Sequence, residues 1–256
     1  MMGPEERARV VEELPGEVTW DEMAMPEGDR HLQAKMGALE VLRSYFGRRG
    51  HKVYLGAELP VYYPGERRFA PDLLVVLDAE QQQRDKWVVS AEGKGLDWVL
   101  EVHVGGDRKK DAEYNVQRYA RLGIPEYFIY DRARQKLHGY WLPTPGARTY
   151  VPLESRQGRY VSKVLGLEMQ IEGERLRFWA GNALLLESGE FIARLEEQLG
   201  EMQQRADAEA HRLQEETRRR EEMERRLGEE VRQREATERR LAEVQAELVR
   251  LEQQRG

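Results

Sequence analysis

Two carboxylates stand inside runs of sequence that are otherwise apolar and strand-like. Asp72 precedes the run LLVVL at 73–77, and Glu101 lies within WVLEVHV at 98–104. A buried carboxylate is costly unless it is protonated, paired or bound to a cation. Carboxylates on neighbouring strands can converge on a hard cation such as Mg²⁺, which takes one or two of them together with waters. Such a metal can activate water and stabilise charge on a phosphate.

Each carboxylate also has an ordinary structural explanation. Asp72 follows a proline, and an Asp at the start of a strand can accept hydrogen bonds from nearby amides. Glu101 could form an ion pair with a Lys or Arg of the helix that follows. The two residues alone therefore leave a metal site and a structural role both open.

His103 and the helix after it carry further polar groups. His103 shares a strand face with Glu101, so it could bind a metal, move a proton, contact phosphate or fill a hydrogen-bonded position. The helix expected over 107–122 has four polar residues one turn apart on one face, namely Asp107, Asp111, Asn115 and Tyr119. An ordinary amphipathic helix would show the same spacing.

The surrounding elements predict an α/β or α+β domain. A helix is expected from near Asp29, because apolar residues follow at helical spacing: Leu32, Met36, Leu39, Leu42 and Phe46. Short apolar runs predict strands at 52–55, 59–63 (separated at Gly56), 73–77, 87–89, 98–104, 126–130, 136–142 and 150–153. Gly123 and Pro125 are typical of the end of the helix over 107–122. A strand, a helix and a strand around Glu101 form a parallel crossover unit.

The composition changes near 184–189, which predicts one domain at 20–186 and a coiled coil at 187–256. Beyond the boundary Pro is absent and Glu, Arg, Gln and Ala dominate. Alternate steps of three and four from Ile192 to Leu251 give 18 positions, of which 12 are apolar. One register along this whole span favours a two-stranded supercoil, and hence a homodimer through 192–251. A single solvated helix with Glu–Arg pairs is the alternative.

Composition excludes several classes of protein. The chain of 256 residues has no Cys, so disulfides, thiolate metal sites and a nucleophilic Cys are excluded. It contains no apolar run of the length that spans a membrane, and its first residues lack the apolar core of a secretion signal. We therefore expect a cytoplasmic protein. The net charge of −6 does not mark a nucleic-acid binder, although local patches matter more than the total.

Several of these segments together resemble the Uma-two family of restriction endonucleases, a branch of the PD-(D/E)XK nuclease superfamily. The resemblance covers most of 20–186, and its most specific block is YARLGIPEYFIYD at 119–131. FAPDLLVV and WVLEVHV match the two strands that carry the acidic residues in the family. The helix that begins with Arg30 and His31 and the segment VLGLEMQIEGERLRFW at 164–179 add to the likeness.

The resemblance implies a restriction-endonuclease-like mixed sheet flanked by helices. It also implies a divalent metal, Mg²⁺ or Mn²⁺, held by Asp72 and Glu101, and water that attacks a phosphodiester of DNA. Asp72, Glu101, His103, Asp111 and Asn115 are the site residues that we expect on this basis.

The chain departs from the family pattern at the basic residue. His103 stands where the superfamily has Lys, and Asn115 stands where the family has Lys on the following helix. An Asn cannot supply a cation for the developing phosphorane charge. His103, Lys109 or Lys110 could substitute. Two functions therefore remain, a metal-dependent DNA endonuclease and an inactive nuclease-fold module for binding or assembly.

Overall fold

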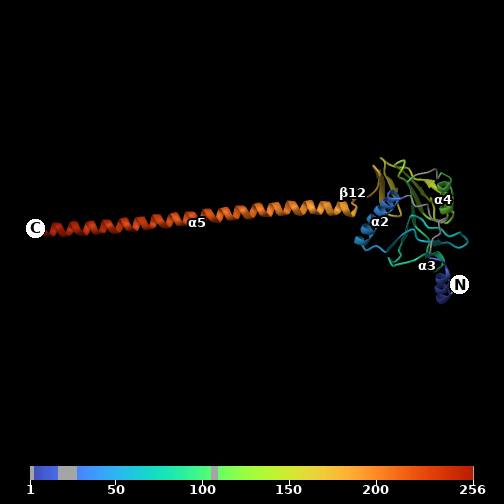
Figure 1. The fold of residues 1–256 in the computed structure, drawn as a ribbon, viewed down its shortest axis with the longest axis horizontal. Coiled ribbons are helices and arrows are strands. Elements are labelled where there is room, and N and C mark those ends of the chain that lie inside the picture. Colours follow the sequence, from blue (N-terminus) through green and yellow to red (C-terminus); the bar gives the residue numbers. More distant parts are fainter. Residues whose placement is uncertain (1–2, 17–27, 105–108, 256) are drawn as a thin grey trace. The chain divides into compact units, whose positions relative to one another are not determined.

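The computed structural model describes residues 3–16, 28–104 and 109–255, without the side chains of 109–112, 247–249 and 251–255. The chain divides into two compact units, 1–191 and 192–256. The helices are α1 (Pro4–Glu13), α2 (Asp29–Arg49), α3 (Val89–Glu92), α4 (Lys109–Arg121) and α5 (Ser188–Arg255) (Figure 1). The strands are β1 (Val53–Ala57), β2 (Val61–Tyr62), β3 (Leu73–Leu77), β4 (Trp87–Val88), β5 (Trp98–His103), β6 (Glu126–Asp131), β7 (Lys136–Trp141), β8 (Val151–Pro152), β9 (Tyr160–Ser162), β10 (Leu167–Glu172), β11 (Arg175–Ala180) and β12 (Ala183–Leu185).

A mixed six-stranded sheet forms the centre of the first unit, in the order β1-β3-β5-β6-β7-β8. Only β5 and β6 of these pair in parallel, and α4 connects them, which confirms the predicted crossover unit. The pairs β1–β3, β3–β5, β6–β7 and β7–β8 are antiparallel. The sheet therefore brings β3 and β5, which carry the two predicted acidic positions, side by side.

The two faces of this sheet belong to two hydrophobic clusters. Side chains alternate along a strand, so Trp98, Leu100 and Val102 of β5 join the cluster that contains α2. Val99 of β5 joins the other cluster, together with Tyr119 of α4. Glu101 has the parity of Val99, and this places its side chain on the α4 side of the sheet.

The buried face of α2 differs from the prediction. Leu32 and Met36 belong to the apolar stripe from which the helix was predicted, but they are 53% and 47% exposed. His31 and Lys35 take the buried positions in the first turns instead, followed by Ala38, Leu39 and Leu42. The physical reason is that the first turns of α2 lie against the acidic residues, so that the side chains buried there are basic.

Several other elements differ from the prediction or were not predicted. Gly56 lies inside β1 opposite Leu74, and does not separate two strands. A Cβ at Gly56 would lie 3.2 Å from Leu74 Cδ1, which explains a glycine within a strand. The helices α1 and α3 were not predicted, whereas the segment 164–179 forms the antiparallel pair β10–β11 of a second, four-stranded sheet.

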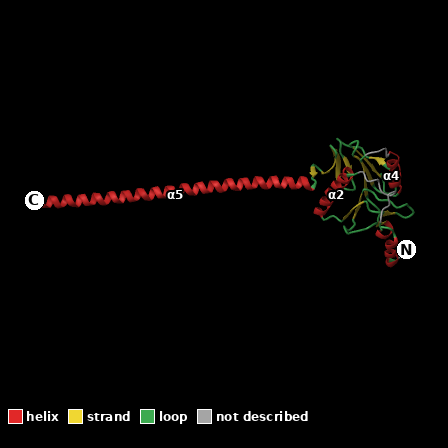
Figure 2. Ribbon diagram, viewed as in Figure 1, coloured by secondary structure: helices red, strands yellow, loops and turns green. Residues whose placement is uncertain are grey.

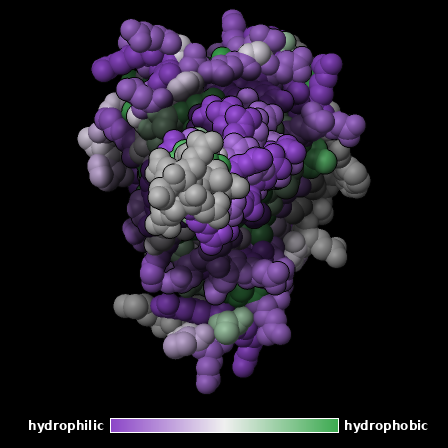
Figure 3. Space-filling view, turned by 90° about the vertical axis from the view of Figure 1, so that its left-hand side faces the viewer, coloured by the Kyte–Doolittle hydropathy of each residue, from purple (hydrophilic) through white to green (hydrophobic). Residues whose placement is uncertain are grey.

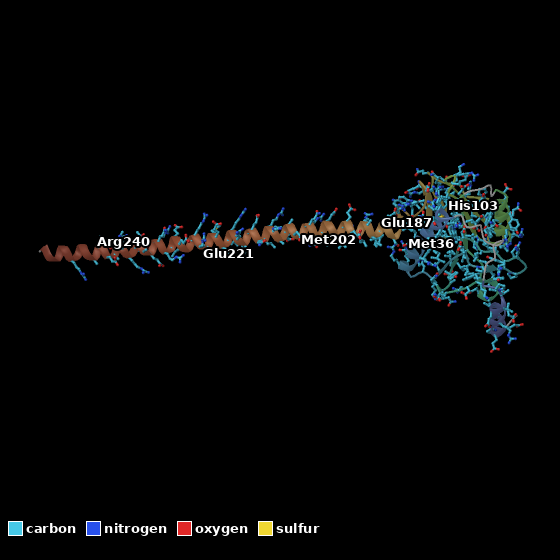
Figure 4. The ribbon with its side chains drawn as sticks, viewed as in Figure 1. Met36, His103, Glu187, Met202, Glu221 and Arg240 are labelled. Atoms are coloured by element: carbon cyan, nitrogen blue, oxygen red, sulfur yellow. The ribbon has the colours of Figure 1, made fainter. Side chains whose placement is uncertain are left out.

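The second unit consists of α5, which is one uninterrupted helix (Figure 2). Its apolar seam residues are exposed, including Ile192 (54%), Leu199 (65%) and Leu241 (59%). Side chains stand off this helix along its length, as at Met202, Glu221 and Arg240 (Figure 4). Hydrophilic side chains cover most of the face in Figure 3, with isolated hydrophobic ones among them. Within the described residues, no helix combines the length and apolarity that crossing a membrane requires.

Candidate active site

Asp72, directly before β3, lies next to Glu101 of the adjacent strand β5. The antiparallel register that pairs Leu73 with Leu100 sets these two residues opposite each other. The backbone N–H of Asp72 donates to Glu101 Oε2 (3.3 Å), and that of Val102 donates to Asp72 Oδ2 (2.7 Å). Both residues are buried, with 4% and 7% exposure. Two carboxyl groups that are 29 residues apart in the sequence thus lie side by side in the protein interior.

Among the described side chains, the hydrogen-bonded contacts of the Glu101 carboxylate include no cation. Its Oε1 accepts a hydrogen bond from the Tyr119 hydroxyl of α4 (2.7 Å). Burial, and next the charge of Asp72, raise the pKa of Glu101 well above its usual value. Burial and the Glu101 charge also raise the pKa of Tyr119, so that this hydroxyl stays protonated and donates. The site therefore disfavours a second negative charge unless a cation is added.

Asp72 is held ionised by basic groups on α2. Nε2 of His31 lies 3.0 Å from Asp72 Oδ1. Burial alone would raise the pKa of Asp72, but His31, the Val102 N–H and the charge of Lys35 outweigh it and lower the pKa. His31 Nε2 is buried and makes no hydrogen bond of good geometry with another described residue, so its contact with Asp72 rests on distance alone.

Lys35 and Glu58 extend the cluster. Lys35, one turn after His31, forms an ion pair through Nζ with Glu58 Oε1. Glu58 follows β1, and its backbone N–H lies within hydrogen-bonding distance of the carbonyls of Pro71 (3.1 Å) and Asp72 (3.3 Å). Two basic and three acidic residues thus gather where α2 meets the adjoining ends of the strands.

The remaining predicted site residues take different positions. His103 ends β5 opposite Asp131, and its charge acts on that carboxyl group, whose pKa is lowered mainly by Arg134 against the effect of burial. Asn115 is half-buried on α4, and among the described residues it makes no hydrogen bond or ion pair with Asp72 or Glu101. Asp111 is also on α4, but its side chain lies outside the described residues, as do those of Lys109 and Lys110.

The residues present fit a hard divalent cation. Glu101 is a buried carboxyl group that a cation would allow to ionise, it lies beside Asp72, and His31 Nε2 is a buried nitrogen without a good hydrogen bond among the described residues. Within the described residues no group of three or more His, Asp or Glu is arranged to hold a metal. Two carboxylates suffice for Mg²⁺, because this ion keeps several of its waters.

Comparison with known proteins identifies the family of this chain. The sequence model of the Uma2 family, described as "Putative restriction endonuclease", matches residues 5–176. The chain belongs to the Uma2 family. This membership agrees with the resemblance found in the sequence, and it supports a nuclease fold and a nuclease as the general class of activity. A search of curated proteins gives no match.

The chain is also similar to solved structures, one of which is a crystal structure of a putative nuclease belonging to DUF820 from Anabaena variabilis. The two sequences are 14% identical, and the match covers 68% of this Uma2 chain and 97% of the other, with a TM-score of 0.47.

Sequence reasoning did not assign His31, Lys35, Glu58 or Tyr119 to the site. Tyr119 was on the polar face that was predicted for the helix, and His31 was part of the resemblance, so both carried a signal. Lys35 and Glu58 carried none that could be separated from ordinary surface charge. Lys35 and Glu58 pair with each other although they lie 23 residues apart in the sequence. The packing of α2 on the sheet brings them together.

Proposed function

We propose that the chain is a Mg²⁺- or Mn²⁺-dependent endonuclease that hydrolyses phosphodiester bonds of DNA, with the metal on Asp72 and Glu101. The observation that carries the proposal is the buried pair itself, in which Glu101 lies against Asp72 and contacts no cation among the described side chains. A charge pattern of this kind needs a bound cation to let both carboxylates ionise. Membership of the Uma2 family makes a nuclease the natural use of that cation.

The roles of the chain's own residues follow from their contacts. When bound, the metal would activate a water molecule and stabilise charge on the scissile phosphate. Tyr119 orients the Glu101 carboxylate through its hydroxyl. The Val102 N–H fixes one oxygen of Asp72, which leaves Oδ1 on the side of His31. These contacts hold the two acidic groups in place before any ligand arrives.

The absence of a Lys at Asn115 supports a second candidate function. A nuclease-fold module that has lost catalysis would bind a partner or nucleic acid and assemble through α5. Asn115 is neutral, so α4 does not supply a positive charge at this position. The two candidates differ in whether the protein turns over a phosphodiester.

Cleavage of supercoiled plasmid and of single-stranded DNA, in Mg²⁺ and then in Mn²⁺, tests the proposal. Wild type should cleave, and Asp72→Ala and Glu101→Ala should not, with circular dichroism showing the same fold in all three. Equal traces in all three would indicate a contaminating nuclease. No cleavage by any of them, with the fold intact, would overturn the nuclease and favour the binding module, and Asn115→Lys would then test whether the missing charge is the cause.

We further propose that α5 joins two copies through 192–251. Its apolar seam residues are exposed in the single chain, and an apolar stripe of this length is costly to leave in water. A dimer would carry two sites, which suits cleavage of both strands of a duplex. Sedimentation equilibrium of the full chain should give twice the monomer mass, and a monomer at high concentration would contradict it. The cytoplasmic location stays a prediction.

A further inference from the structure

The proposed reaction needs a positive charge, and Asn115 stands where the family pattern has the lysine that would supply it. Hydrolysis of a phosphodiester adds negative charge to the phosphate in the transition state, and a preorganised cation stabilises it. Asn115 is neutral, and the charge of His103 acts on Asp131 of the neighbouring strand. The positive charge would therefore have to come from another basic side chain near the acidic pair.

The helix α2 directs two basic side chains at the acidic cluster. His31 and Lys35 are one turn apart and so share a face of the helix. His31 reaches Asp72, at 3.0 Å. Lys35 is only 3% exposed, although a buried Lys is uncommon unless it is paired. It pairs with Glu58, and its charge is also felt at Asp72.

Glu58 holds this lysine next to the site by an unusual backbone geometry. Its φ is +50°, a conformation that a residue with a side chain adopts at an energetic cost. Its N–H is directed toward the carbonyls of Pro71 and Asp72. Strained residues of this kind persist where the surroundings hold them, and they cluster at functional sites. The segment that carries Asp72 and the counter-ion of Lys35 are thus bound to each other.

We infer that Lys35 of α2 supplies the positive charge for phosphodiester hydrolysis, in place of the position occupied by Asn115. This inference rests on the proposed function. The oxygen of water forms the new bond to phosphorus and gives up a proton to solvent, as the bond to the leaving sugar oxygen breaks and that oxygen takes a proton from solvent water. Lys35 keeps its proton throughout and contributes only its charge, with Glu58 holding the ammonium group in place.

Four variants of the full chain separate this role from a structural one. Lys35→Met removes the charge, Lys35→Arg keeps it, and Lys35→Met/Glu58→Gln removes the buried pair together, so that no unpaired charge remains. Lys52→Met is the matched control, because Lys52 also pairs with a glutamate, Glu80, but at an exposed position. Four quantities are measured: the single-turnover cleavage rate, the Kd for DNA in Ca²⁺, the Kd for Mn²⁺ by calorimetry without DNA, and the melting temperature.

A charge that acts in the transition state should change the rate but not the binding. We expect Lys35→Met and the double variant to cleave about a hundredfold more slowly, with DNA affinity unchanged. Their Mn²⁺ affinity should be unchanged or higher, because a like charge has been removed from beside the metal. Lys35→Arg should recover most of the rate, and Lys52→Met should behave as wild type.

Two results would overturn the inference while the nuclease stands. One is cleavage by Lys35→Met at the wild-type rate. The other is loss of Mn²⁺ binding and a lower melting temperature in both Lys35→Met and the double variant, which would make Lys35 structural. If only Lys35→Met fails to fold, the cleavage rate of the double variant decides. If wild type binds Mn²⁺ but does not cleave DNA, the proposed function fails and this role fails with it.

Discussion

The two units of the molecule use apolar and charged residues in opposite ways. In residues 1–191 the apolar side chains are buried in two clusters, and the few buried charges gather largely at one place, around Asp72 and Glu101. In α5 the apolar side chains are exposed, and the charges pair along the helix surface, as Arg220 does with Glu216 and Arg234 with Glu230. Under the two proposals, a cation would neutralise the buried acidic pair, and a second chain would cover the exposed seam.

This difference shows where stability has been given up for function. Paired charges on a helix surface contribute only a few tenths of a kcal/mol each, about 0.3–0.5. A carboxylate in the core costs much more, and it is retained only where something else requires it. The first unit therefore concentrates its unfavourable contributions to the folding free energy at the acidic pair. The second spreads them along the exposed seam. The predictions below test this contrast at each place.

The largest effect is expected at Glu101, where activity and stability should move in opposite directions. Glu101→Gln keeps an acceptor for Tyr119 but removes the group that can ionise and bind a metal. Cleavage should fall by at least about a hundredfold, since one of the proposed metal ligands is lost. Without metal the variant should be more stable than wild type at neutral pH by about 1 kcal/mol or more, because folding no longer has to bury this carboxyl group charged or to protonate it. Urea unfolding in EDTA measures this. A destabilised variant would show that Glu101 is part of the structural core.

The second prediction breaks the seam of α5. Leu241→Glu places a charge at a seam position in both copies, whereas Ala242→Glu adds the same charge to the same turn outside the seam. Each dimer loses two buried leucines at about 1.5–3 kcal/mol each. The dimer dissociation constant should therefore rise by about a hundredfold or more for Leu241→Glu, with little change for Ala242→Glu. Equal effects of the two, measured by sedimentation, would place the contact elsewhere on the helix.

The third prediction concerns the residue that orients Glu101. Tyr119→Phe removes the hydroxyl that donates to Glu101 Oε1, so Mn²⁺ affinity should fall about 10–100-fold. Tyr127→Phe is the matched control, since the Tyr127 hydroxyl is buried in the same cluster and has no hydrogen-bond partner among the described residues. Calorimetric titration compares the two. A similar loss of affinity in both would mean that the core responds to any lost hydroxyl and that the contact with Glu101 is not specific.

The central strands could be predicted from sequence because each apolar run was compatible with little other than a buried strand. The run at 73–77 is β3 as predicted, and the runs that became β5 and β6 differ from the prediction by one residue at one end. A continuous apolar run between turn residues has few alternatives as a buried strand. The opposition of Asp72 and Glu101 then follows from the pairing of β3 with β5.

The basic half of the site could not be predicted because two stripes of α2 are compatible with helical spacing. One contains Leu32 and Met36, and the other contains His31 and Lys35; both continue into Leu39 and Leu42. Hydrophobicity favours the first stripe, but the structure buries the second. The choice depends on what the helix meets, and the acidic residues it meets come from strands 23 or more residues further along the chain. Local periodicity does not contain that information.

The smallest effect is expected at Glu126, a buried carboxylate that has partners and so contrasts with Glu101. It accepts hydrogen bonds from the Ser162 hydroxyl and from the backbone N–H groups of Lys163 (2.8 Å) and Val164 (3.2 Å). Burial raises its pKa above the ordinary value of 4.5, and these bonds offset only part of the rise. The folded state therefore binds the proton more tightly than the unfolded chain does, and this contribution to stability is complete below about pH 4.5 and is lost as pH rises through the folded pKa.

Glu126→Gln keeps an acceptor for the two N–H groups and does not titrate. Its free energy of unfolding relative to wild type should thus increase by the order of 1 kcal/mol between pH 4 and pH 8. The exposed Glu154→Gln should show no such change, and a difference with the opposite slope would mean that the hydrogen bonds of Glu126 outweigh its burial.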